Sequence, residues 1–100
     1  MNNKVLVKLL VPELDASFDV FIPVNEVVWR VKKIMAKSIF DLTNGDLDVN
    51  KEYVLINKLT SKFYENNSII IDTDIRNATE LIFLSIKDSD IIEMIVPRAI

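Results

Sequence analysis

The sequence predicts a single domain of the α+β class. Three features support this prediction: two short alternating segments around a turn, one segment with helical periodicity after them, and further strand-like segments in the second half. The chain has 100 residues, which suits one hydrophobic core. Half of the residues are apolar and 27% are charged, so the composition is that of a folded globule rather than a disordered chain.

Residues 4–22 are predicted to form a β-hairpin. Residues 4–11 alternate imperfectly and contain β-branched side chains, which favours a short strand. Residues 12–15 have turn chemistry, because proline fixes φ and aspartate hydrogen-bonds to nearby backbone. Residues 16–22 alternate again, so two strands are expected to meet around a short turn.

One amphipathic helix is predicted over residues 26–42. Apolar side chains recur there at helical spacing, while the basic side chains fall outside the apolar stripe. Asn25 is the expected N-cap, and the pair 44–45, Asn-Gly, marks the C-terminal end. Trp29 lies beside the stripe, where packing at the helix edge is favoured over a role as an anchor for a partner.

The second half is predicted to add a second hairpin and a last strand. Residues 53–56 read as a strand, and residues 57–61 as a turn into a very short strand at 62–64. A loop follows, and residues 79–86 alternate as the last strong strand. Residues 87–100 begin polar and become apolar.

The composition excludes many classes of enzyme. The absence of cysteine removes disulfides and thiolate chemistry, and the absence of histidine removes the commonest general base and zinc ligand. The net charge of −3 gives no general attraction to nucleic acid or anionic lipid. We therefore expect no enzymatic activity, no cofactor, no metal and no nucleic-acid partner.

Three acidic pairs could be imagined as calcium ligands. Calcium takes several oxygen ligands at short spacing, but the twelve-residue calcium loop with its glycine and terminal glutamate is not present. Turn capping and surface hydration are the simpler interpretation of the pairs Asp46/Asp48, Asp72/Asp74 and Asp88/Asp90.

The sequence predicts a soluble cytoplasmic protein. Its N-terminus has no signal-peptide core, and no run of roughly eighteen apolar residues occurs. Direct insertion into a membrane is not expected.

A motif in residues 53–85 resembles a known family. The element order is that of the β-grasp fold, and residues 4–86 resemble ubiquitin in spacing. The chain is similar, more closely, to the YukD/EsaB-like family of small bacterial ubiquitin-like proteins associated with type VII secretion. That family shows an Asn-Lys-x-Thr-Gly turn and then Ile-x-Asn-Gly-Thr-x-Leu; here these segments read NKLTS at 57–61 and IRNATEL at 75–81. The resemblance implies a mixed sheet of four or five strands wrapped around one main helix.

Two positions depart from the family pattern. Ser61 and Ala78 stand where the resemblance implies glycine. If the backbone needs a positive φ there, each non-glycine residue costs roughly 1 kcal/mol or shifts the turn.

The resemblance implies a non-enzymatic protein-binding module, an accessory or regulatory component of a bacterial type VII secretion system. Its partner would be a protein, such as a cytoplasmic domain of a membrane secretion component. A ubiquitin-like modifier or sulfur carrier is the disfavoured alternative, because residues 97–100 read Pro-Arg-Ala-Ile rather than ending in Gly-Gly. A homo-oligomeric structural module is the third possible function.

The sheet face away from the helix is the predicted binding surface. Period-two geometry sends several apolar side chains outward, Phe21 among them, and exposed apolar patches tend to mark interaction sites. The predicted partner-binding residues are Leu6, Lys8, Leu10, Leu55, Ile82 and Leu84. By the resemblance, Leu10, Leu55 and Leu84 are similar to ubiquitin's apolar recognition patch. Two alternatives remain for this face: the tail at 87–100, outside the predicted domain of 1–86, packs on it, or two copies form a homodimer through it.

Overall fold

A computed structural model describes residues 3–85. The chain forms four strands, one α-helix and two short 3₁₀ turns in this range. Their bounds are β1 Lys4–Val11, η1 Pro12–Leu14, β2 Ala16–Pro23, α1 Val28–Leu42, β3 Tyr53–Asn57, η2 Ile70–Asp72 and β4 Glu80–Ser85. The predicted C-terminal segment 87–100, with the two roles expected of it, lies outside the described residues.

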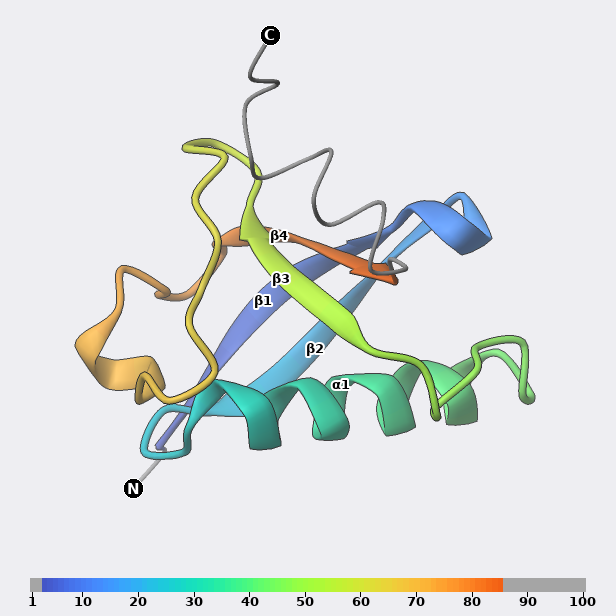
Figure 1. The fold of residues 1–100 in the computed structure, drawn as a ribbon, viewed down its shortest axis with the longest axis horizontal. Helices are drawn as coiled ribbons and strands as arrows, with labels where there is room; N and C mark the ends of the chain where they lie inside the picture. Colours follow the sequence, from blue (N-terminus) through green and yellow to red (C-terminus); the bar gives the residue numbers. More distant parts are fainter. Residues whose placement is uncertain (1–2, 86–100) are drawn as a thin grey trace, which may run out of the picture.

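The four strands form one mixed sheet in the order β2-β1-β4-β3. The pairs β1/β2 and β3/β4 are antiparallel, while the central pair β1/β4 is parallel. Helix α1 crosses one face of this sheet (Figure 1). The predicted α+β class, with a mixed sheet and one main helix, is confirmed.

The first hairpin has its predicted position. β1 and β2 pair over their whole length, from Lys4 opposite Pro23 to Val11 opposite Ala16. Asp15 closes the turn with a φ of 50°, and its amide donates to the carbonyl oxygen of Pro12 at 3.1 Å. Aspartate tolerates this left-handed conformation better than most residues, so the turn chemistry explains the hairpin.

Helix α1 begins later than predicted. The N-cap is Val27, with no side-chain cap, so the prediction for Asn25 is wrong. The free amides of the first turn bind to a distant loop instead: Val28 N donates to the Ser68 carbonyl at 2.8 Å, and Trp29 N donates to the Asn66 carbonyl at 3.1 Å. These bonds satisfy the amides that a side-chain cap otherwise serves.

The predicted C-terminal signal of the helix is confirmed. Asn44 and Gly45 both have positive φ, at 56° and 92°, and the Gly45 amide donates to the Phe40 carbonyl at 2.8 Å. This is the left-handed ending in which glycine carries little steric cost.

The core lies between α1 and the inner face of the sheet. The helix contributes its buried apolar stripe, and each strand contributes alternate residues. Tyr53 stacks on Phe83 with ring centroids 4.4 Å apart, and its hydroxyl donates to the Asp48 carbonyl at 2.7 Å. The largest fully buried side chains include Leu9, Ile22, Met35, Ile39, Leu55, Ile70, Ile75, Leu81 and Phe83.

The second hairpin is shorter than a regular pair of strands. The predicted strand at 62–64 is reduced to an isolated bridge between Phe63 and Ile56. Two hydrogen bonds hold it: Asn57 N donates to the Lys62 carbonyl at 2.8 Å, and Tyr64 N donates to the Leu55 carbonyl at 3.1 Å. The short segment therefore covers part of the free edge of β3.

Candidate functional site

The turn after β3 is built around Asn57, the one buried polar residue within the described part of the chain. Its Oδ1 accepts hydrogen bonds from the amides of Leu59 at 2.8 Å and Thr60 at 3.1 Å. Its Nδ2 donates to the Tyr64 hydroxyl at 3.0 Å, and that hydroxyl donates to Asp74. Burial, with the hydrogen bond to Asp74, raises the pKa of Tyr64 to about 12. The Asn57 side chain thus organises its own turn and joins it to a second loop.

The second motif segment attaches the last loop to β1. Asn77 Oδ1 accepts from the amide of Leu6 at 2.8 Å, and the Ala78 amide donates to the Leu6 carbonyl at 2.8 Å. Ser61 and Ala78 have φ angles of 60° and 72°. Both positions at which glycine was expected therefore hold the left-handed backbone that favours glycine.

The side of the sheet away from α1, here called the outer face, carries five of the six predicted binding residues. Lys8 is exposed and Leu6 is 36% exposed, while the others are half-buried. The register places Leu10 opposite Ile82, which puts the two central strands' side chains next to each other. The five residues are Leu6, Lys8, Leu10, Ile82 and Leu84.

The prediction for Leu55 is wrong. Its side chain is 1% exposed and belongs to the core, because it pairs directly with the core residue Phe83 across β3 and β4. Directly opposed residues of an antiparallel pair point to the same face. The outward side chains of β3 are therefore Val54, opposite Leu84, and Ile56, opposite Ile82.

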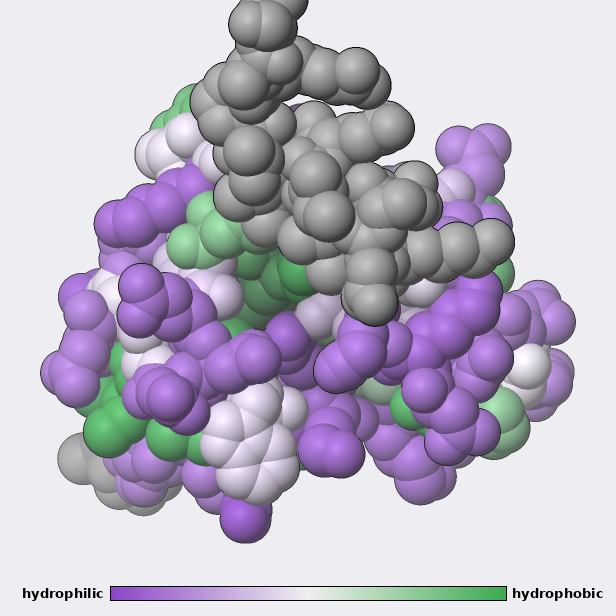
Figure 2. All heavy atoms as spheres, in the orientation of Figure 1, coloured by the Kyte–Doolittle hydropathy of each residue, from purple (hydrophilic) through white to green (hydrophobic). Residues whose placement is uncertain are grey.

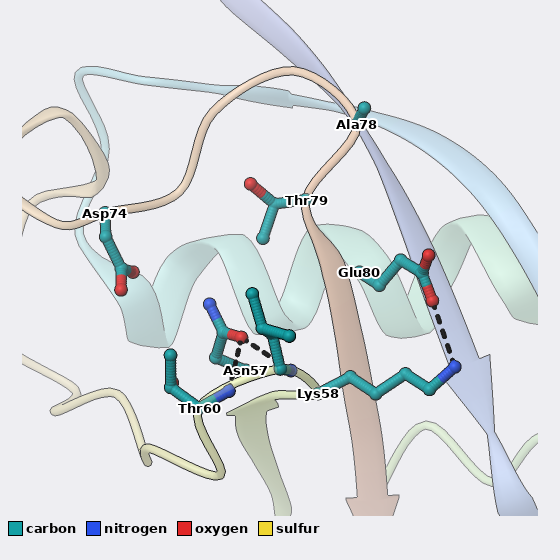
Figure 3. Close-up of a pocket in the computed structure, with 8 residues that line it drawn as sticks. Asn57, Lys58, Thr60, Asp74, Ala78, Thr79 and Glu80 are labelled. Atoms are coloured by element: carbon teal, nitrogen blue, oxygen red, sulfur yellow. Dashed lines mark hydrogen bonds and ion pairs between the residues drawn. The ribbon is translucent and has the colours of Figure 1, made fainter.

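A row of four charged residues crosses the outer face. One residue comes from each of the strands β2, β1 and β4, and the fourth directly follows β3. The sequence reasoning did not identify this row. From the β2 edge to the β3 edge it reads Asp19, Lys8, Glu80 and Lys58, with Lys58 directly after the last residue of β3. Lys58 Nζ lies 3.2 Å from Glu80 Oε1. Figure 3 marks this ion pair with a dashed line. Charges of opposite sign thus alternate across the whole sheet.

Two hollows border this row. One, of about 550 Å³, is lined by the β3 turn and the start of β4, including Asn57, Lys58, Ala78 and Glu80 (Figure 3). The other, of about 460 Å³, is mainly apolar and includes Leu6 in its lining. In the first hollow, Asn57 Oδ1 binds amides of its own turn, and Lys58 pairs with Glu80.

The helix side of the molecule carries exposed charged side chains and three exposed apolar ones, which are Trp29, Phe40 and Leu42. Figure 2 shows mostly hydrophilic residues on the side where α1 lies. Lys37 pairs with Asp41 at 3.0 Å, and the Arg30 guanidinium lies 5.4 Å from the centre of the Trp29 ring. Burial lowers the pKa of Lys32, whose Nζ donates to the Tyr53 carbonyl at 2.7 Å, while Glu52 opposes this shift. These contacts favour a solvated helix face, with Trp29 40% exposed at its edge.

Within residues 3–85, no three carboxylates gather as a potential metal site. Of the acidic pair at 72 and 74, Asp74 helps to hold its loop, because it accepts the hydrogen bond from the Tyr64 hydroxyl. In the same range, no helix has the length and apolar character needed to cross a membrane.

Comparison with known proteins shows the fold. No protein-family model matches the chain, and no curated protein matches it. Among solved structures, it is similar to the N-terminal ubiquitin-like domain of the 4931431F19Rik protein, with a TM-score of 0.65 and 18% identity over 87% of this chain and 79% of that one. It is also similar to the ubiquitin-like domain of Plasmodium falciparum Dsk2, with a TM-score of 0.64 and 18% identity over 83% and 99%.

A third similar structure is a chain of the MycP5-free ESX-5 inner membrane complex. The TM-score is 0.63 and the identity 15%, over 87% of this chain and 22% of that chain. At these identities the likeness concerns architecture. The described part of the chain therefore has a ubiquitin-like β-grasp fold of the α+β class.

Proposed function

We propose that this protein is a non-enzymatic binding module that docks on another protein through its outer face. The single observation that carries the proposal is the composition of that face. A sheet face that is not covered by a helix is commonly polar, so that it can face water. Here Leu6 and Phe21 are 36% and 57% exposed, and half-buried Leu10, Ile82 and Leu84 lie beyond the charged row.

The outer face has the make-up of a protein-binding surface. Apolar side chains on both sides of the charged row can be buried by a partner. Burial of one such side chain from full exposure is worth about 1.5–3 kcal/mol, and a half-buried one gains part of this. The charged row limits which partners fit, because a like charge placed against it is unfavourable. Affinity would thus come from the apolar residues and selectivity from the row.

The proposed setting is bacterial type VII secretion, with the protein as a cytoplasmic accessory or regulatory component. Two observations support it. The segments 57–61 and 75–81 resemble the YukD/EsaB-like motif. In addition, one similar solved structure is a chain of an inner membrane complex, in which a region of this size accounts for about a fifth of the chain. The expected partner is a cytoplasmic domain of a membrane secretion component.

Site-specific photo-crosslinking in cells tests this proposal. A photoreactive residue replaces Leu84 on the outer face, and the matched control carries it at Lys37, which is exposed on the helix. Captured proteins are identified by mass spectrometry from both soluble and detergent-extracted fractions. We expect a secretion component to be crosslinked from position 84 and not from position 37. Equal crosslinking from both positions, or none from position 84, would contradict the proposal.

A further inference from the structure

The charged row on the outer face has an internal symmetry. Its signs run minus, plus, minus, plus from the β2 edge to the β3 edge, with the midpoint between β1 and β4. A half-turn that exchanges the two ends of the row therefore converts every sign into its opposite. Among residues 3–85, the structure records no ion pair within 4 Å for Lys8 or Asp19. Two of the four charges are thus available to an intermolecular partner.

Two copies of the face can be related by a two-fold axis in two simple ways. If the axis runs along the strands between β1 and β4, Lys8 of one copy lies over Glu80 of the other. Asp19 then lies over Lys58, so all facing charges attract. If the axis runs along the row, each charge lies over its own equivalent and all four contacts are repulsive. The row therefore selects one of the two arrangements.

The apolar rows agree with the favourable arrangement. The same half-turn places Leu10 over Ile82 of the second copy, because these residues are register partners in β1 and β4. On the other side of the charged row, Leu6 is aligned with Ala78, whose amide donates to the Leu6 carbonyl. Leu6 of one copy would face the small Ala78 of the other, beside the apolar hollow of about 460 Å³. Leu10 and Ile82 thus form an apolar contact between the two sheets, and Leu6 meets a smaller side chain that leaves room for it.

We propose that a second copy of this chain occupies the outer face, as a two-fold dimer with its axis along β1 and β4. Lys8 pairs with the second copy's Glu80, and Asp19 pairs with its Lys58. This inference rests on the proposed function, since it names an occupant of the same face. The dimer is the form of the protein when no secretion component is bound, and that component would displace the second copy.

Charge reversal and mixing test the dimer, using sedimentation velocity of the full chain. The Lys8→Glu variant places two like-charge contacts in the interface, as does Glu80→Lys, and we expect each to weaken dimerisation by about a hundredfold or more. In an equimolar mixture of these two variants all four facing charges are again opposite, so dimers should return. The pair Asp19→Lys and Lys58→Glu follows the same logic and provides an independent mixture. Thermal melting confirms that each variant is folded.

The controls use the helix side. Lys37→Glu and Asp41→Lys make the same changes of net charge in an exposed ion pair of α1, and the dimer should be unaffected by either. A monomeric wild-type chain at the highest soluble concentration would overturn the inference. So would a dimer that survives Lys8→Glu, or variants that stay monomeric when mixed.

The outcomes separate this inference from the proposed function. A monomeric wild type whose position 84 still crosslinks to a secretion component would overturn the dimer and support the function. Dimers restored by mixing, with no secretion component captured from position 84, would support the dimer and contradict the setting proposed for it.

Discussion

Ser61 and Ala78 hold a backbone conformation that L-residues rarely adopt, with φ angles of 60° and 72°. Both side chains are exposed, so replacing either by glycine removes little packing. Neither backbone hydrogen bond needs the side chain: Ser61 N donates to the Asn57 carbonyl, and Ala78 N donates to the Leu6 carbonyl, each at 2.8 Å. We therefore predict that Ser61→Gly and Ala78→Gly each stabilise the domain.

The expected gain follows from two opposing contributions. The left-handed conformation costs an L-residue about 1–2 kcal/mol, and glycine removes this cost. Glycine also makes the unfolded chain more flexible, which takes back about 0.4–1 kcal/mol. The middle of the resulting range is a net gain of about 0.5–1 kcal/mol for each substitution. For a domain of this size, that corresponds to an increase in melting temperature of about 2–8 °C.

Urea unfolding and thermal melting measure this gain. Ala16→Gly is the matched control for Ala78→Gly, because Ala16 is also exposed but lies in the extended strand β2. That control should lose about 0.5–1 kcal/mol, since glycine weakens a strand. If Ala78→Gly lowered stability as much as Ala16→Gly does, the argument from backbone strain would be wrong.

Three further predictions concern the turn, the core and pH. Asn57→Ala should cost about 2–3 kcal/mol in urea unfolding, because it leaves the amides of its turn without their acceptor. Leu55→Asp should lower the free energy of unfolding by at least about 4 kcal/mol. Leu84→Asp should change it by no more than about 1 kcal/mol and impair only partner capture. Similar melting temperatures for the two variants would refute the core position of Leu55. Tyr64 has a pKa raised to about 12 in the folded domain, so the unfolded chain loses this proton first and stability should fall as the pH rises from about 10 to about 12. Tyr64→Phe should make that loss smaller, which thermal melts across this pH range would show.

The strands and the helix were predictable because their signals are local. Alternation in residues 4–11 and 16–22 gave both strands of the first hairpin, since one face is buried and the other is not. β3 gave no such signal. Four of its five residues are apolar, so the sequence does not show which of them point inward, and the assignment of Leu55 to the surface followed from the wrong choice. Pairing with Phe83 decides the orientation of Leu55, and that pairing is a tertiary contact.

The prediction of the helix start was wrong for a related reason. Asn25 is a good N-cap in isolation, but the carbonyl groups of Asn66 and Ser68 reach the first-turn amides from about forty residues away. The charged row was missed because it depends on the parallel register between β1 and β4. Lys8 and Glu80 are 72 positions apart in sequence, and only the fold makes them neighbours.

The motif that suggested the family and the residues that would bind a partner are largely different. Asn57 and Asn77 use their side chains to hold the turn after β3 and the loop before β4, and the glycine positions set the backbone there. These residues therefore determine the fold, and substitutions among them should impair binding only as far as they impair stability. Leu6, Lys8, Leu10 and Ile82 lie outside the segments 57–61 and 75–81, and they face away from the core. In our proposal, binding specificity resides in outer-face residues that do not hold these turns, so the partner is to be sought by probing the outer face itself.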